Sequence, residues 1–89
     1  MNESYLEVTY RRGRAIAAYF YLPRRRGDKS QRTARIAPGM IVDFARGDRP
    51  IGIEITAPRK LTVAAMNRAL KQLGFPEVKR ADLAPLRAA

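Results

Sequence analysis

Three residue types are missing from this chain of 89 residues: cysteine, histidine and tryptophan. Without cysteine and histidine, no disulfide bond and no zinc site of the Cys/His type can form. The commonest general base and the commonest metal-binding nitrogen and sulfur atoms are missing too. Acid–base or metal chemistry would depend on carboxylates alone, so we expect a protein that is not an enzyme and uses no cofactor.

Long apolar runs are also missing. The longest uncharged apolar run, Ala15 to Leu22, is far shorter than the ~20 residues that span a bilayer. Residues 1–7 contain no basic start and no apolar stretch, so no signal peptide is expected. We therefore expect a soluble, cytoplasmic protein that does not bind membranes.

Acidic residues are few: the chain has 8 against 18 lysines and arginines, which gives a net charge of +10. Much of the positive charge falls within residues 11–35, where Asp28 is the only carboxylate. Such a dense basic segment attracts polyanions such as nucleic acid. However, abundant arginine and alanine are also what GC-rich codon usage gives a protein of any function. Composition alone leaves both explanations open.

The length allows one domain, over residues 1–89, because a second core would have too few residues to close. A domain this small has a thin stability margin, which disulfides, a structural metal or self-association often improve. With the first two excluded, self-association remains, and we expect a homo-oligomer, most simply a homodimer.

Apolar residues recur at every second position from Tyr5 to Thr56, which is the periodicity of β-strands. The pattern predicts a hairpin over residues 5–22, a strand over 33–37 and a second hairpin over 40–56. Pro50 has no N–H group, so it is expected at the first position of the last strand. The proline, glycine and charges of residues 23–31 predict a loop.

The strand that ends the first hairpin is apolar on both sides. One face is expected to carry Ile16, Ala18, Phe20 and Leu22, and the other Ala15, Ala17, Tyr19 and Tyr21. A strand of this kind should be covered on both faces, but one helix can cover only one. A partner chain is therefore expected on the second face, with Tyr19 and Tyr21 as the self-association residues.

The apolar period changes to that of a helix after Pro58. We predict a helix over residues 62–73, capped by the Thr62 hydroxyl at its start and by Gly74 at its end. A further helical turn is expected around residues 79–84. The fold class is thus α+β: an antiparallel sheet of four to five strands with one C-terminal helix packed on a face. Residues 4–57 form the sheet module and residues 58–89 the helical extension.

Residues 40–55 read MIVDFARGDRPIGIEI, and residues 6–10 read LEVTY. This pattern resembles the small prokaryotic family known as domain of unknown function 2283, whose last hairpin carries Val-Asp-aromatic and then Gly-Ile-Glu-Ile. The resemblance covers residues 4–57 and omits the helical tail. The loop before Thr33 departs from the family by being longer and more basic. The resemblance implies the sheet fold, and some members lie beside toxin-like genes, which implies an antitoxin-like role.

The strongest candidate site is the basic loop and the strand after it. Arginine's planar guanidinium suits phosphate groups, and tyrosines on a sheet beside cations can stack unpaired bases. A solvated, mobile loop and a dimer interface are the competing explanations. The expected contacts to nucleic acid or another acidic partner are Arg24, Arg25, Arg26, Lys29, Arg32 and Arg35.

Asp43 and Glu54 are the one pair of carboxylates that the second hairpin could bring together. Two carboxylates on one sheet face could hold Mg²⁺ or Ca²⁺. The simpler interpretation, which we prefer, gives each a salt bridge or hydrogen bond, so no metal site is expected. The sequence therefore predicts a non-enzymatic binding module for nucleic acid. The alternatives are a protein–protein module, antitoxin-like or self-assembling, and a carboxylate-dependent metal site or enzyme at Asp43 and Glu54.

Overall fold

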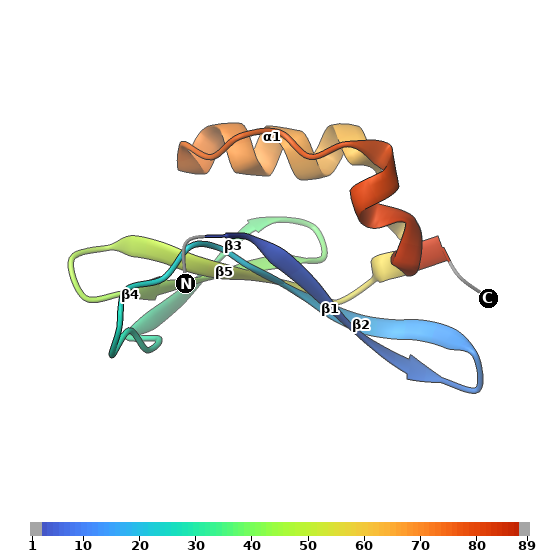
Figure 1. The fold of residues 1–89 in the computed structure, drawn as a ribbon, viewed down its shortest axis with the longest axis horizontal. Helices are drawn as coiled ribbons and strands as arrows, with labels where there is room; N and C mark the ends of the chain where they lie inside the picture. Colours follow the sequence, from blue (N-terminus) through green and yellow to red (C-terminus); the bar gives the residue numbers. More distant parts are fainter. Residues whose placement is uncertain (1–2, 88–89) are drawn as a thin grey trace.

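The computed structural model describes residues 3–87; residues 1–2 and 88–89, the ends of the expected domain, lie outside the described residues. Its strands and helices follow one another in the order the sequence predicts, and the α+β fold class is confirmed (Figure 1). The elements are β1 (Tyr5–Arg11), β2 (Arg14–Tyr21), β3 (Arg32–Ala37), β4 (Met40–Ala45), β5 (Arg49–Ile55), the 3₁₀ helix η1 (Pro58–Lys60), α1 (Val63–Leu73) and the 3₁₀ helix η2 (Arg80–Arg87).

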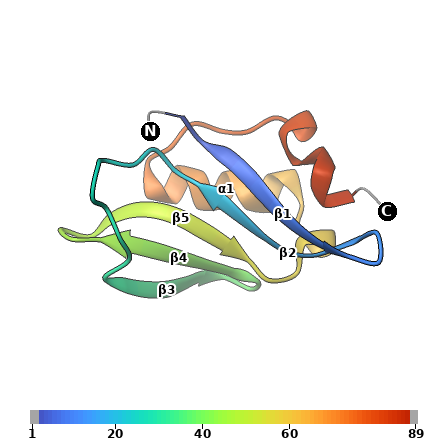
Figure 2. The same cartoon turned by 60° about the horizontal axis from the view of Figure 1, so that its bottom comes forward.

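The five strands form one antiparallel sheet in the order β1-β2-β5-β4-β3. β1 and β2 make one hairpin, while β3, β4 and β5 make a meander (Figure 2). The two units join where β2 pairs with β5, between Ala18↔Ile55 and Tyr21↔Gly52. This pairing brings the start and the end of the strand region together at the centre of the sheet.

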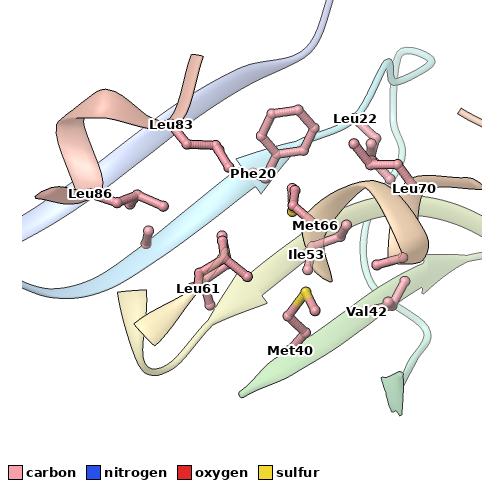
Figure 3. Packing of buried hydrophobic residues seen from close by; sticks show 13 residues of the cluster. Phe20, Leu22, Met40, Val42, Ile53, Leu61, Met66, Leu70, Leu83 and Leu86 are labelled. Atoms are coloured by element: carbon pink, nitrogen blue, oxygen red, sulfur yellow. The ribbon is translucent and has the colours of Figure 1, made fainter. Parts of the chain in front are cut away.

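Helix α1 covers one face of the sheet (Figure 1). Met66 and Leu70 of α1 are almost fully buried and pack with Phe20, Val42 and Ile53 from three strands (Figure 3). Leu83 and Leu86 of η2 extend the same core. Every fully buried side chain among residues 3–87 is apolar. The hydrophobic effect therefore acts on one face of the sheet, which we call the covered face.

The ends of α1 confirm the predicted caps. The Thr62 hydroxyl accepts a hydrogen bond from the Ala65 N–H at 3.0 Å, and Gly74 ends the helix with a left-handed φ of 84°. The helix itself begins at Val63 rather than residue 62. Beyond it, η2 spans Arg80–Arg87 and contains Pro85, so the turn predicted at 79–84 is longer than expected. No helix among residues 3–87 has the length and apolarity needed to cross a membrane.

The placement predicted for Ile16 is wrong. The pairing of β1 with β2 shifts at Thr9 and Tyr10, where Thr9 opposes Ala17 and Tyr10 opposes Ala15. The bulge places one extra residue in β2 and reverses the alternation before it. Ala15 is therefore buried with the core, and Ile16 is 47% exposed. Two smaller corrections concern β3, which begins at Arg32, and Pro50, which is the second residue of β5.

Candidate functional site

The sheet face opposite α1 is the natural place for a site, because no element among residues 3–87 covers it (Figure 1). Directly opposed residues of an antiparallel sheet share a face, so the strand register assigns its members. We call this surface the open face. Two cross-strand rows form its centre: Glu7, Tyr19, Glu54, Ile41 and Arg35 in the first, and Tyr5, Tyr21, Gly52, Asp43 and Thr33 in the second.

Tyr19 crosses the open face over Gly52. A Cβ atom on Gly52 would lie 2.1 Å from the Tyr19 hydroxyl oxygen, so only glycine leaves room for the ring there. The tyrosine hydroxyl reaches β4 and donates to Asp43 Oδ2 at 2.6 Å. The other oxygen of Asp43 accepts from the Ser30 hydroxyl at 2.9 Å. Tyr19 and Asp43 thereby link β2, β4 and the loop that precedes β3.

Arg24 extends this network at the edge of the open face. Its Nε donates to the Ile51 carbonyl and its Nη2 to the Tyr19 hydroxyl, both at 3.2 Å. The guanidinium carbon lies 5.0 Å from the centre of the Tyr21 ring, which is cation–π distance. Tyr21 also stacks on Tyr5, with 4.4 Å between the ring centres. These contacts hold the first part of the loop against the sheet.

Burial and Asp43 set the protonation of Tyr19. Burial of the phenol, the hydrogen bond to Asp43 and the charge of that carboxylate together raise the pKa of Tyr19 well above 10.0. Burial, followed by the charge of Glu7, raises the pKa of Tyr21 as well. Both hydroxyls therefore remain protonated donors at neutral and mildly alkaline pH.

The loop of residues 23–31 is anchored in its middle as well as at its ends. The Asp28 side chain is only 9% exposed and accepts two hydrogen bonds from the guanidinium of Arg49, of which the Nη2–Oδ1 bond measures 2.7 Å. The Arg25 N–H donates to the same carboxylate at 2.8 Å. The bonds from Arg49, then that from Arg25, hold the pKa of Asp28 well below its usual 3.8.

A surface hollow of about 430 Å³ lies between this loop and the β4–β5 turn. Five basic side chains and one carboxylate line it, and we call it the basic hollow. Asp28 is bonded to Arg49, and the other four cations leave the hollow with a strong positive charge. Arginine-lined hollows of this kind suit phosphate oxygens. The charged lining residues are Arg25, Arg26, Lys29, Arg46, Arg49 and Asp28.

The six residues predicted as a single contact surface separate into three places. Arg25, Arg26 and Lys29 line the basic hollow, and Arg24 lies beside it against the tyrosines. Arg32 lies on the covered side, where its guanidinium carbon is 4.0 Å from the centre of the Phe44 ring and its Nε donates to Asp48 at 2.8 Å. Arg35 is exposed on the edge strand β3.

Two further basic residues of the hollow, Arg46 and Arg49, were not predicted. Arg46 lies in the turn between β4 and β5 and Arg49 is the first residue of β5, within the hairpin predicted over residues 40–56. The available signal was the acidic residue Asp28, isolated in a basic segment. An isolated carboxylate there requires a basic partner, and Arg49 provides it.

Asp43 and Glu54 share the open face but are not directly opposed. Asp43 pairs with Gly52, whereas Glu54 pairs with Ile41. Both oxygens of Asp43 already accept hydrogen bonds from hydroxyl groups. Among residues 3–87, no three carboxylates gather into a group that could hold a metal ion. The geometry thus gives Asp43 a structural role in joining the strands and the loop.

In comparisons with known proteins, no family model, no curated protein and no solved structure matches the chain. The resemblance of residues 4–57 to domain of unknown function 2283 therefore stays a prediction.

Proposed function

We propose that this protein is a non-enzymatic module that binds nucleic acid through the basic hollow. The observation that carries the proposal is the convergence of five basic side chains from two separate segments, with one carboxylate among them. Phosphate groups are the ligands that such a lining fits best. The net charge of +10 would add long-range attraction for a polyanion.

The fixed geometry of the loop supports a binding role. Because Asp28 bonds to Arg49 and to the Arg25 N–H, the loop backbone and the Arg49 guanidinium are held in place before a ligand arrives. A preorganised site loses less conformational entropy on binding than a mobile loop does. Codon usage alone would raise the number of arginines but would not gather them around one hollow.

The test is fluorescence anisotropy of labelled oligonucleotides across a salt series. Arg25→Gln with Arg26→Gln should weaken binding about tenfold and reduce the salt slope by roughly 1.4, since each single-strand phosphate contact contributes about 0.7. The matched control is Arg68→Gln with Lys71→Gln on α1, which removes the same charge from the opposite side of the sheet. Equal loss in the two variants would mean that the charge acts only in bulk, and the proposal would be wrong.

Self-association is a second candidate, and one observation favours it. Within residues 3–87 no segment covers the open face, where Tyr19, Tyr21 and Ile41 are only half-buried. A second copy of the chain would remove this apolar area from water. Light scattering at micromolar concentration decides the matter, because the mass of a single chain would exclude a stable homodimer.

Three further proposals follow, of which the first two rest on the sequence. We infer membership of the family called domain of unknown function 2283 from residues 4–57, and with it an antitoxin-like protein partner as the alternative ligand. We infer a cytoplasmic location. We also infer that Asp43 performs no catalysis, because Tyr19 and Ser30 use both of its oxygens. Replacing Asp43 with Asn should therefore lower stability, which thermal melting measures.

A further inference from the structure

We propose that the nucleic acid is a single strand that lies along the open face and is held at both ends, by the basic hollow and by Arg11 and Arg14 at the tip of the β1–β2 hairpin. This inference rests on the proposed function and deepens it. It names the form of the nucleic acid and its path, and adds a second cationic contact about one strand length from the first.

The register places Arg11 and Arg14 on the open face. These two residues are directly opposed, two rows beyond the pair Thr9 and Ala17, which belongs to the open face. The intervening row faces the covered side: Ala15 is buried, and the Tyr10 hydroxyl donates to the Pro85 carbonyl at 2.6 Å. Alternation then returns Arg11 and Arg14 to the open face.

Figure 1 shows where the two segments lie. The tip of the β1–β2 hairpin bends away from α1 at one end of the longest axis, and the loop of residues 23–31 projects to the same side near the other end. The chain measures 38 Å along that axis. The open face thus lies between two basic segments, the β1–β2 hairpin tip and the loop of residues 23–31.

The length of β2, which runs between the two segments, fits a short single strand of nucleic acid. β2 runs from Arg14 to Tyr21, against which Arg24 packs, and its 8 residues cover about 25 Å at ~3.3 Å each. A strand stacked as in a duplex has one phosphate per ~3.4 Å and crosses that distance in about seven nucleotides, and fewer are needed when its bases unstack and turn to the open face. Such a length lies within the ~4–16 nucleotides that small sheet-based domains bind.

The negative charges of the open face favour a single strand of nucleic acid over a duplex. Glu7, Asp43 and Glu54 lie between the two cationic ends. A duplex presents phosphates on every side and would place some against these carboxylates. A single strand can instead turn its bases toward the open face, where the ring of Tyr5, a residue that is 44% exposed, offers a stacking surface.

The experiment compares oligonucleotide lengths. Labelled oligo-dT of 4 and 12 nucleotides, oligo-rU of 12 and a 12-base-pair duplex are titrated by anisotropy into the full chain and into Arg11→Gln with Arg14→Gln. Arg12, which has a left-handed φ of 53°, is left unchanged to preserve the turn. The α1 variant Arg68→Gln with Lys71→Gln is the charge-matched control, and thermal melting confirms that each variant is folded.

The expected result depends on length. The hairpin-tip variant should bind the 12-mers about tenfold more weakly than the α1 control does, with a salt slope smaller by roughly 1.4, but bind the 4-mer equally well. Equal affinity of the two variants for the 12-mer, or tighter binding of the duplex, would overturn this inference and leave the basic hollow intact. No binding of any oligonucleotide by the unaltered chain would instead overturn the proposed function itself.

Discussion

The two faces of the sheet use the same strands in opposite ways. On the covered face, Phe20, Val42 and Ile53 pack against α1 with no buried polar group among the described residues. On the open face, Tyr19 and Asp43 hold the strands together with hydrogen bonds that remain partly in contact with solvent. The comparison teaches that stability depends mainly on one face, which leaves the other free to carry charge and aromatic rings.

The largest effect should come from removing a side chain of the covered face. Met66 is fully buried at the centre of the α1 contact. Met66→Ala should lower the free energy of unfolding by about 2–5 kcal/mol, because the cavity adds to the lost apolar burial. Chemical denaturation measures the change. A loss of no more than about 0.5 kcal/mol, the range of surface substitutions, would show that the covered face contributes no more to stability than an exposed surface does.

A smaller effect is expected at the crossing of Tyr19 over Gly52. Gly52→Ala should cost about 1–3 kcal/mol, because the new methyl group overlaps the tyrosine hydroxyl and ring. In a Tyr19→Ala background the same substitution should cost much less, since the overlapping atoms are gone. Chemical denaturation of the two single variants and the double variant gives the three unfolding free energies that a double-mutant cycle needs. Additive losses would show that Tyr19 does not occupy the space above Gly52.

The smallest effect concerns the pH dependence of the loop. The folded pKa of Asp28 is lowered by Arg49, so the carboxylate contributes stability above pH 3.8 that is lost as the pH falls further. Asp28→Asn should flatten this part of the stability curve between pH 2 and 4. Melting temperatures across that range measure it. An unchanged acid slope in the variant would mean that the Asp28–Arg49 pair is not formed in solution.

The strands and helix could be predicted because each has a strong local signal. Alternating apolar residues mark the hairpins, and Thr62 and Gly74 mark the helix ends. The error at Ile16 has a physical reason: a bulge inserts a residue without changing the apolar character of the segment, so period alone cannot detect it. Likewise, Pro85 lies inside η2, where a proline would be expected to end a helix.

The candidate site was less predictable, because long-range contacts define it. The charge of Arg25 and Arg26 is visible in the sequence, but their neighbours Arg46 and Arg49 come from the β4–β5 turn and the start of β5. Arg32 belongs to the same basic segment, yet the alternation of β3 carries it to the covered side against Phe44. Sequence proximity therefore grouped residues that the sheet separates.

The order of the strands has a consequence for folding. The β1–β2 hairpin and the β3–β4–β5 meander each pair residues close in sequence. β2 and β5 are separated in sequence by β3 and β4, so their pairing carries a larger entropic cost of chain closure. Joining the two units should therefore be the slow step, since non-local pairing limits folding rates. The contacts of Tyr19 with Asp43 and of Arg24 with Ile51 cross that junction. The basic hollow lies on the meander side of this junction, whereas the open face proposed to carry the nucleic acid would be complete only after β2 and β5 pair.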